Sequence, residues 1–523
     1  MCAQNNFVES VMDNQANTAT KPKRFVGSKE SWALALAGLG QGMMYSTMSS
    51  YISDFYINIM GLPLVFVMLL MLLARVWDAI NDPMMGMIVD RTRPTKYGKM
   101  KPFIILFAIP IAVATFLMFY APEGFNMTQN MIYAGVVYVG WGMLYTAADV
   151  PFWALPNVMT PDPEERGGII SFAKTVNGVG SAVPMAIFMI LSWIPYFAEG
   201  ATLQAEKQKY MIIALVCSLI GTALYLLAFF YPKERVIIPP KAKKDPNEPG
   251  TLKRLFKCKP LMLVVLCGVL SSGRYMMQAA AIHVARYAFY IGPSLEGVTD
   301  AVVRQQYLSG SVGTVSTLFQ ICSAVGMFGS MLAMPFLYKK FNYKQIVIVS
   351  CLGGFVASIA TTVLGACSIF TVANWLVYLM IPFIIIQCIP LGALNVTMFA
   401  MIGDSLDYLE WQTGFRDNAL GAACQSFVNK LGNAFATTFI VIMYLIVNID
   451  PAQSVAQEAV KSVMDMTGAQ RFGMFALVSI VPGLSLVLCA IPIFFYDIVG
   501  EKKERITAEL EVMRQEKGIA IEA

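Results

Sequence analysis

Two aspartates, Asp78 and Asp82, lie four residues apart within an apolar stretch that is long enough to cross a membrane. Residues at this spacing share one face of an α-helix, and Arg75 lies on the same side one turn earlier. A carboxylate at the middle of a bilayer costs roughly 2.5 to 3.5 kcal/mol on insertion scales, so two of them require a compensating partner. A Na⁺ ion or a proton is the simplest such partner.

A second apolar stretch, YTAADVPFWALP, carries related chemistry. Thr146 lies three residues before Asp149, and Trp153 lies four residues after it, so the three side chains share one side of a helix. Hydroxyl and carboxylate oxygens bind hard cations, so two helices carry ligands of this kind. The pattern predicts a cation site.

Two lysines are expected at the same depth as these oxygens. The four oxygen-bearing side chains lie about 10 to 16 Å from the predicted cytoplasmic ends of their helices, at about 1.5 Å per residue. By the same count Lys174 and Lys430 reach this layer. A cluster of opposite charges at one depth is what a coupling site requires, and buried salt bridges that only hold helices together are the alternative.

The composition places these residues in a membrane protein. The chain is 57% hydrophobic and 14% charged, whereas an ordinary soluble domain has about 25% charged residues. Apolar stretches long enough to span a bilayer recur along the chain and predict twelve transmembrane helices. These are expected near residues 30–57, 62–89, 102–121, 131–157, 167–194, 210–231, 260–290, 311–338, 344–369, 373–401, 417–448 and 471–497.

One long polar interruption divides the spans into six and six. This hydropathy pattern is typical of a duplicated transporter. The predicted fold is therefore an all-α membrane protein of two six-helix pseudo-symmetric bundles, the major facilitator fold. Lys and Arg are concentrated in this interruption and in the loop after the second span, which predicts a multi-pass plasma (inner) membrane protein with both termini cytoplasmic. The predicted parts are a polar cytoplasmic segment 1–29, a bundle 30–231, a basic linker 232–259, a bundle 260–497 and a charged tail 498–523.

Charge and cysteine content exclude other classes of protein. The net charge of +5 comes from basic residues in short loops and not from one face, so no nucleic-acid partner is expected. The ten cysteines show no paired spacing, so no metal cluster or disulfide framework is expected. We expect no cofactor apart from the coupling ion, with membrane lipid as surroundings and a monomer as the unit.

Three segments together resemble a known transporter family. They are WDAINDPMMG with the charged loop after it, WGMLYTAADVPFWALP, and GDSLDYLEWQTGFRDNALGAACQSFVNKLGNAF late in the chain. These segments resemble the glycoside-pentoside-hexuronide:cation symporter family, typified by melibiose permease, within the major facilitator superfamily. The resemblance extends through both halves of the chain.

The resemblance implies roles for individual residues. The expected cation-site residues are Asp78, Asp82, Asn81, Thr146 and Lys430, with Asp78, Asp82 and Thr146 as ligands of Na⁺ if sodium is the coupling ion. The expected sugar-site residues are Asp149, Trp153, Lys174, Gln425 and Ser426. From its position on the seventh span, Arg274 is a further cavity-lining candidate, with a packing role as the alternative.

Two positions depart from the family pattern. Lys174 stands where melibiose permease has an arginine, which keeps the charge and loses the bidentate fork. Gln41 and Gly42 stand where that protein has Lys-Asp, so a galactoside-type contact is lost. Loss of a carboxylate beside a retained Lys174 suits an anionic sugar such as a hexuronide, and equally a neutral pentoside held by different contacts.

The loop after the second span resembles the superfamily's gating motif. Gly86 is expected to allow close helix packing, and Asp90 and Arg91 to form a latch on the cytoplasmic side. Topology control by the positive charges of the same loop is the alternative and is compatible with a latch.

The predicted function is cation-coupled symport of a glycoside, pentoside or hexuronide by alternating access, and no enzyme activity is expected. Na⁺ is favoured because it needs several oxygen ligands, whereas a proton needs one carboxylate. The alternatives are a proton-coupled glucuronide symporter and a non-transporting sugar sensor on the same scaffold. A magnesium-dependent prenyltransferase is disfavoured because Asp78 and Asp82 lie within a span.

Overall fold

The computed structural model is built from helices and describes residues 25–160, 163–194, 197, 203–235, 258–371, 375–413, 418–449, 451 and 462–516. The first half contains α2 (Ser28–Asp54) with its π-helical extension η1 (Phe55–Ile59), α3 (Leu64–Arg91), α4 (Lys101–Met118), α5 (Met127–Met159), α6 (Pro163–Ser192), α7 (Leu203–Tyr225) and α8 (Leu227–Phe230). The second half contains α10 (Lys259–Leu270), η3 (Ser271–Tyr275), α11 (Met276–Ala279), α12 (Ala281–Tyr287), α13 (Ala301–Leu337), α14 (Tyr343–Thr371), α15 (Leu376–Thr413), α16 (Asn418–Ile446), η4 (Val463–Asp465), α18 (Gly468–Ala476), α19 (Ile480–Phe494) and α20 (Glu501–Glu516).

The predicted membrane-spanning architecture is confirmed in its main features. Among the described residues, 11 helical segments are long and apolar enough to cross a membrane. The 27-residue helix α2 packs among them and brings the bundle to the predicted twelve, although its polar and small residues make it less apolar. Some boundaries differ from prediction: α13 begins at Ala301 and not near residue 311, and α15 continues to Thr413.

The seventh predicted span is not one continuous helix. It is divided into α10, a 3₁₀ turn η3, α11 and α12. Backbone groups freed at the first break are satisfied by Ser485 of α19, which donates to the carbonyl of Leu270 at 2.5 Å and accepts from the N–H of Gly273 at 2.8 Å. Because no water is present in a bilayer to satisfy such groups, this break depends on a neighbouring helix.

Small residues bring α2 close to its neighbours. A side chain at Gly40 would collide with the carbonyl of Gly221 on α7, and one at Gly42 would collide with the carbonyl of Asn177 on α6. Close backbone approach through small residues is the usual way in which membrane helices associate. These contacts fix the position of Gln41, which lies between the two glycines.

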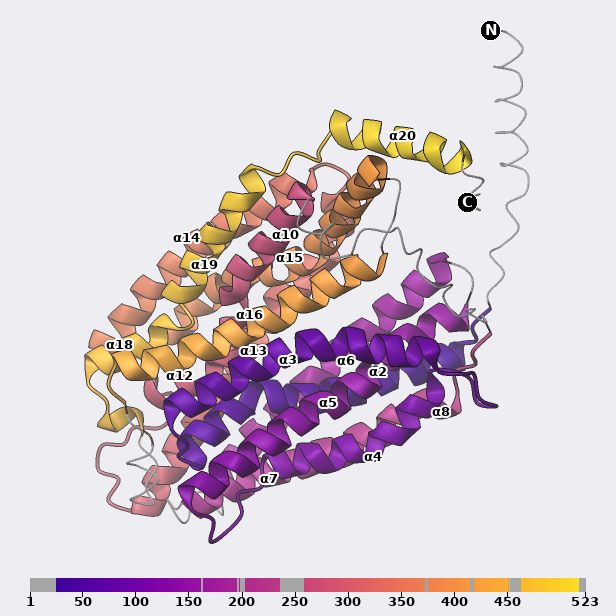
Figure 1. Cartoon of the computed structure of the whole chain (residues 1–523). Helices are drawn as coiled ribbons and strands as arrows, with labels where there is room; N and C mark the ends of the chain where they lie inside the picture. The colour runs from indigo at the N-terminus through magenta and orange to yellow at the C-terminus, as the bar shows by residue number, and fades with distance from the viewer. Residues whose placement is uncertain are drawn as a thin grey trace.

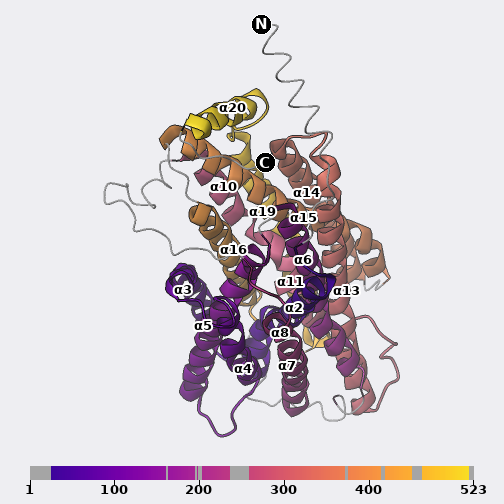
Figure 2. The same ribbon diagram turned by 90° about the vertical axis from the view of Figure 1, so that its right-hand side faces the viewer.

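The two halves contact each other along α3 with α16 and along α6 with α13. In Figure 1, α3 and α16 diverge towards the end of the molecule at which α20 lies. Figure 2 shows α3, α4, α5 and α7 on one side and α10, α14 and α19 on the other, with α2, α6, α13 and α16 between them. A site on α3, α5 and α16 therefore lies where the halves meet.

The chain after α8 returns to the first half and stabilises its loops. Both carboxylate oxygens of Glu234 accept backbone N–H groups at the start of α4, from Lys99, Met100 and Lys101 at 2.7, 2.8 and 3.1 Å. This is a carboxylate cap at a helix N-terminus. The neighbouring Arg235 pairs with Glu30 of α2 at 2.6 Å, so α2 and α4 are joined at this end.

Candidate functional site

Asp82 of α3 lies at the meeting point of three helices. Lys430 of α16 donates to its carboxylate at 2.5 Å, and the Thr146 hydroxyl of α5 donates to it at 3.0 Å. The side chains of Lys430 and Asp82 are 24% and 18% exposed, so the pair is largely withdrawn from solvent. One carboxylate thus connects the two halves of the molecule and binds the hydroxyl that the sequence predicts beside it.

Asp78 lies one turn earlier on α3 and has a different counter-ion. Its carboxylate is buried and pairs with Arg75 of the same helix at 3.2 Å. Gly142 of α5 faces it, since a Cβ there would lie 3.2 Å from an Asp78 oxygen. A crevice of about 250 Å³, lined by Arg75, Asp78, Tyr138 and Gly142 among others, reaches this carboxylate.

The two aspartates therefore share a helix face as predicted, and each already has a protein cation beside it. Among the described residues, no group of three or more His, Cys, Asp or Glu side chains could hold a metal ion. The predicted sodium ligands are two carboxylates and a hydroxyl, all of which are hard oxygen donors. The side-chain nitrogen of Asn81 is buried and makes no hydrogen bond with the described part of the chain.

The predicted sugar-binding side chains gather on α5 and its neighbours. Asp149 accepts a hydrogen bond from the amide of Gln41 on α2, and the Gln41 oxygen accepts from Asn177 of α6 at 3.4 Å. The ammonium of Lys174 on α6 lies 3.4 Å from the centre of the Trp153 ring, a cation–π contact. Gln41, which stood out in the sequence only as a lost family contact, is thus a direct partner of Asp149.

Other predicted site residues are placed elsewhere or lie outside the description. Arg274 is buried in the second half, where it donates to the hydroxyl of Tyr275 at 2.8 Å, and Tyr275 donates to Asn429 of α16 at 3.0 Å. A Cβ at Gly86 would meet no atom within 4 Å, so the predicted close packing at Gly86 is not found in this conformation. The side chains of Asp90, Arg91, Gln425 and Ser426 lie outside the described residues.

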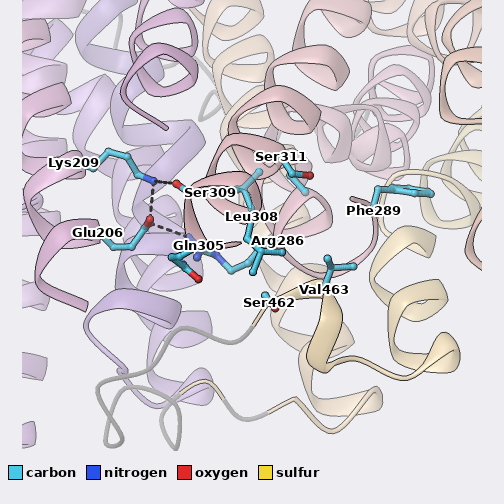
Figure 3. A pocket seen from close by; sticks show the side chains of 12 residues that line it. Glu206, Lys209, Arg286, Phe289, Gln305, Leu308, Ser309, Ser311, Ser462 and Val463 are labelled. Atoms are coloured by element: carbon cyan, nitrogen blue, oxygen red, sulfur yellow. Dashed lines mark hydrogen bonds and ion pairs between the residues drawn. The ribbon is translucent and has the colours of Figure 1, made fainter. Parts of the chain in front are cut away.

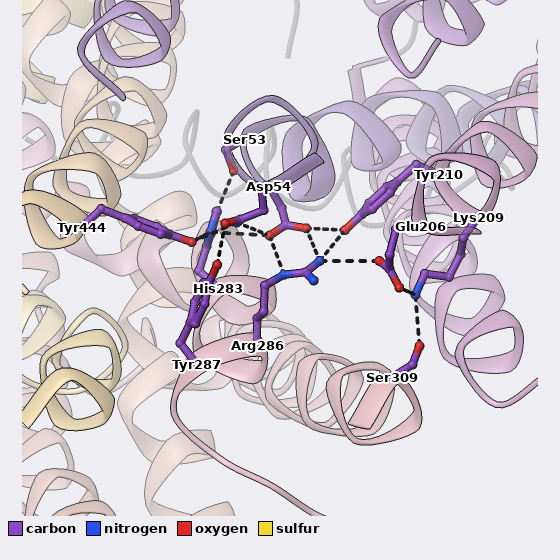
Figure 4. Close-up of polar contacts among 11 residues, drawn as sticks. Ser53, Asp54, Glu206, Lys209, Tyr210, His283, Arg286, Tyr287, Ser309 and Tyr444 are labelled. Carbon is purple, nitrogen blue, oxygen red and sulfur yellow. Dashed lines mark hydrogen bonds and ion pairs between the residues drawn. The ribbon is translucent and has the colours of Figure 1, made fainter. Parts of the chain in front are cut away.

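The sequence analysis missed a second group of buried charges. Asp54, Glu206, Lys209 and Arg286 lie together where α2 ends and α7 begins (Figure 4). Asp54 and Arg286 fall within predicted spans, so the signal that identified Asp78 was available for them. Glu206 and Lys209 were assigned to a loop because the predicted span began near residue 210, whereas α7 begins at Leu203.

Comparisons with known proteins identify the family of this chain. Residues 33–292 and 305–500 match the family model described as MFS/sugar transport protein. The chain is 25% identical over 435 residues to the isoprimeverose transporter of Lactiplantibacillus pentosus, covering 80% of this chain and 81% of that protein. It is 21% identical over 483 residues to the glucuronide carrier protein homolog of Escherichia coli K12, covering 91% and 94%.

A solved structure shows the same fold. The bacterial homolog of the human lysosomal transporter Spinster, in its inward-facing and unoccupied conformation, matches with a TM-score of 0.57 at 15% identity. The match covers 91% of this chain and 97% of that one.

Proposed function

This chain belongs to the family of MFS/sugar transport proteins, and we propose that it couples transport of a glycoside, pentoside or hexuronide to Na⁺ by alternating access. It is a membrane transporter that carries sugars by symport and not an enzyme. The proposal concerns the coupling ion, the class of sugar and the residues that bind each of them.

The observation that carries the proposal is the contact of Asp82 with both Lys430 and Thr146. A sodium ion that binds between Asp78, Asp82 and Thr146 takes over the role of counter-ion to Asp82. Because two cations repel each other at that distance, the ion displaces the Lys430 ammonium. Lys430 belongs to the opposite half, so ion binding changes a contact between the halves, which is what coupling requires.

The sugar site is connected to the ion site through one helix. Thr146 and Asp149 are both on α5, so an ion that fixes Thr146 also fixes the acid proposed to accept sugar hydroxyls. The Trp153 ring supplies an apolar face and Lys174 a positive charge beside it. Bound ion then strengthens sugar binding, and bound sugar strengthens ion binding by the same coupling free energy, typically about 1 to 3 kcal/mol.

The charges around Asp149 bear on the class of sugar. Gln41 donates to Asp149 and brings no second carboxylate, so Lys174 faces one acid here and not two. That arrangement suits a hexuronide, and one similar protein is named as a glucuronide carrier homolog while another is named for isoprimeverose. Binding that is unchanged when the carboxylate of the sugar is removed would exclude the anionic version.

A proton is the second candidate for the coupling ion. The 2.5 Å contact between Lys430 and Asp82 supports it, because protonation of Asp82 would also release the lysine.

The proposed orientation, with both termini cytoplasmic, rests on the excess of Lys and Arg in the linker and in the loop after α3. One chain supplies both halves of the site, and we take the monomer as the functional unit.

The test is binding of a panel of glycosides, pentosides and glucuronides to the purified protein with and without Na⁺, using wild type and Asp78→Cys. Tighter binding of one sugar with Na⁺, abolished by Asp78→Cys, supports the proposed site. Binding that ignores Na⁺ but depends on pH through Asp78 identifies a proton as the ion. If no sugar binds and the substitution only lowers thermal stability, the carboxylates serve only to hold helices together.

Binding without uptake into proteoliposomes would identify a sugar sensor on this scaffold. Uptake of the bound sugar, driven by a sodium gradient and absent without it, separates a symporter from that alternative.

A further inference from the structure

Four charged side chains are buried together where α2 ends and α7 begins. Asp54 lies at the end of α2, Glu206 and Lys209 on α7, and Arg286 on α12. All four are less than 9% exposed. We call them the outer cluster. Such a group is costly to bury unless its members are paired, so the pairing shows what the cluster holds together.

The central contact of the outer cluster joins the two halves. Arg286, from the second half, donates to both carboxylate oxygens of Asp54, from the first half, at 2.8 and 3.2 Å (Figure 4). Tyr210 of α7 donates to the same carboxylate, and Arg286 lies 3.7 Å from Glu206. A bidentate pair, in which a guanidinium donates two hydrogen bonds to a carboxylate, is among the strongest polar contacts in proteins.

Neutral hydrogen bonds around Asp54 also cross between the halves. Asn58, one turn after Asp54, donates to the Tyr444 hydroxyl of α16 at 3.0 Å and accepts from the Tyr287 hydroxyl of α12 at 2.6 Å. Ser53 and the ring of His283 are hydrogen-bonded at 3.0 Å. Every one of these bonds must break if the halves separate at this end.

The rim of the cluster faces a crevice. Lys209 bonds Glu206 at 2.7 Å and the Ser309 hydroxyl of α13, in the other half, at 3.3 Å. The crevice of about 420 Å³ is lined by these side chains together with Arg286 and Ser462 (Figure 3). One oxygen of Glu206 is buried and has no hydrogen-bond partner among the described residues. Water that enters this crevice therefore meets charged groups that it solvates well.

We propose that the outer cluster is the outer gate of the transport cycle, which holds the halves together in this conformation and opens when Arg286 and Asp54 separate and become hydrated. In the closed state the charges lose their hydration, and their pairing offsets this cost. In the open state the charges are no longer paired, and water solvates them instead. Two states whose large opposing terms nearly cancel differ little in free energy, as a gate requires. The inference rests on the proposed alternating access, but not on the identity of the sugar or ion.

The experiment measures opening directly, without sugar or Na⁺. Ala285 is 1% exposed and lines the crevice, so Ala285→Cys in a background without the native cysteines reports opening through its reaction rate with a hydrophilic methanethiosulfonate reagent in nanodiscs. In the closed state, Asp54→Asn leaves Arg286 with only the longer contact to Glu206, and Arg286→Gln leaves Asp54 without its guanidinium, whereas water solvates the remaining charge in the open state. Each variant is expected to raise the labelling rate roughly ten- to hundredfold.

The double variant distinguishes a gate from general loosening. Asp54→Asn combined with Arg286→Gln leaves neither charge of the pair buried, so it is expected to react more slowly than either single variant. The matched control is Arg471→Gln, because Arg471 of α18 bonds only within its own half in the described contacts, to the carbonyl of Ala288 at 3.0 Å. It is expected to react at the wild-type rate.

A milder variant keeps the test decisive if the charge variants fail to fold. Asn58→Ala removes two neutral bonds between the halves and the amide that donates to Asp54 at 2.7 Å, and it is expected to raise the rate roughly two- to tenfold. A wild-type labelling rate in folded Asn58→Ala protein, and in any charge variant that folds, would overturn the proposal and make the cluster a static support. Equal rates in the double and single variants would overturn it as well. Because neither sugar nor Na⁺ is present, these outcomes are independent of whether the proposed coupling site is right.

Discussion

Replacing Lys430 with glutamine tests the competition between lysine and sodium at Asp82. The substitution keeps a hydrogen-bonding side chain of similar length and removes the charge that lies 2.5 Å from the carboxylate. If Lys430 is the counter-ion that Na⁺ must displace, its removal makes the site easier to fill. We therefore expect Lys430→Gln to bind Na⁺ more tightly than wild type, whereas loss of a structural contact would weaken binding.

The size of the effect follows from the geometry of the pair. A hydrogen bond to a charged group contributes about 1.5 to 3 kcal/mol. Because the two side chains are 24% and 18% exposed, solvent screening favours the lower end of this range. A difference of about 1.4 kcal/mol is tenfold in an equilibrium constant, so the sodium affinity should rise roughly tenfold. The enhancement of sugar binding by Na⁺ should fall, because the ion no longer releases a contact between α3 and α16.

Thr146→Val supplies a comparison of opposite sign. It keeps the shape of the side chain and removes the hydroxyl that lies 3.0 Å from Asp82, so it should weaken sodium binding. Lys502→Gln is the matched control, because it removes a lysine from an exposed ion pair with Asp497 that lies outside the membrane spans. Sodium titrations of the purified proteins, followed by calorimetry and by tryptophan fluorescence, measure all three.

The reasoning is refuted if Lys430→Gln binds Na⁺ with unchanged or lower affinity while Thr146→Val weakens it. In that case Lys430 supports the site and does not compete with the ion. If neither variant changes sodium binding, Asp82 is not a ligand of Na⁺ at all.

Three further predictions concern single contacts. Asp78→Cys should abolish the effect of Na⁺ on sugar binding, while the sugar still binds without Na⁺. Equilibrium binding of a labelled sugar measures this, and a persisting sodium effect would exclude Asp78 as a ligand of Na⁺. Gln41→Ala removes the donor to Asp149 and should lower sugar affinity roughly tenfold with sodium affinity of the sugar-free protein unchanged; unchanged sugar affinity would show that Gln41 does not prepare the acid. Glu234→Gln weakens a carboxylate cap on three backbone N–H groups and should lower the free energy of unfolding by about 1 kcal/mol without affecting sugar binding, as measured by thermal unfolding and the same binding assay; full stability would show that the cap is dispensable.

Sequence reasoning predicted the helices well because a bilayer imposes a strong local rule. A span needs about 20 apolar residues, and a run of that length is visible without any knowledge of the fold. Helix α2 was predicted although it is less apolar than the other spans. The breaks around η3 were not predicted, because the backbone groups they free are satisfied by Ser485 of α19, which is far away in the chain.

The candidate site was predictable to the extent that it lies on single helices. Asp78 and Asp82 share a face because of their spacing, and the same holds for Thr146 and Asp149. The spacing could not show that Lys430 would reach Asp82, since the two residues are separated by most of the chain and meet only because α16 packs against α3. It could not show that Gln41 of α2 would bond to Asp149 of α5 either, because the two residues are far apart in the chain.

The outer cluster shows the same division. The sequence by itself determined that Asp54 and Arg286 lie in apolar segments, where an unpaired charge is unfavourable, and so that each requires a partner. Only the tertiary structure decided that they are each other's partner across the two halves. The physical reason is one of range: helical periodicity and hydropathy act over neighbouring residues, whereas the pairing of charges far apart in the chain depends on which helices pack together and at what depth.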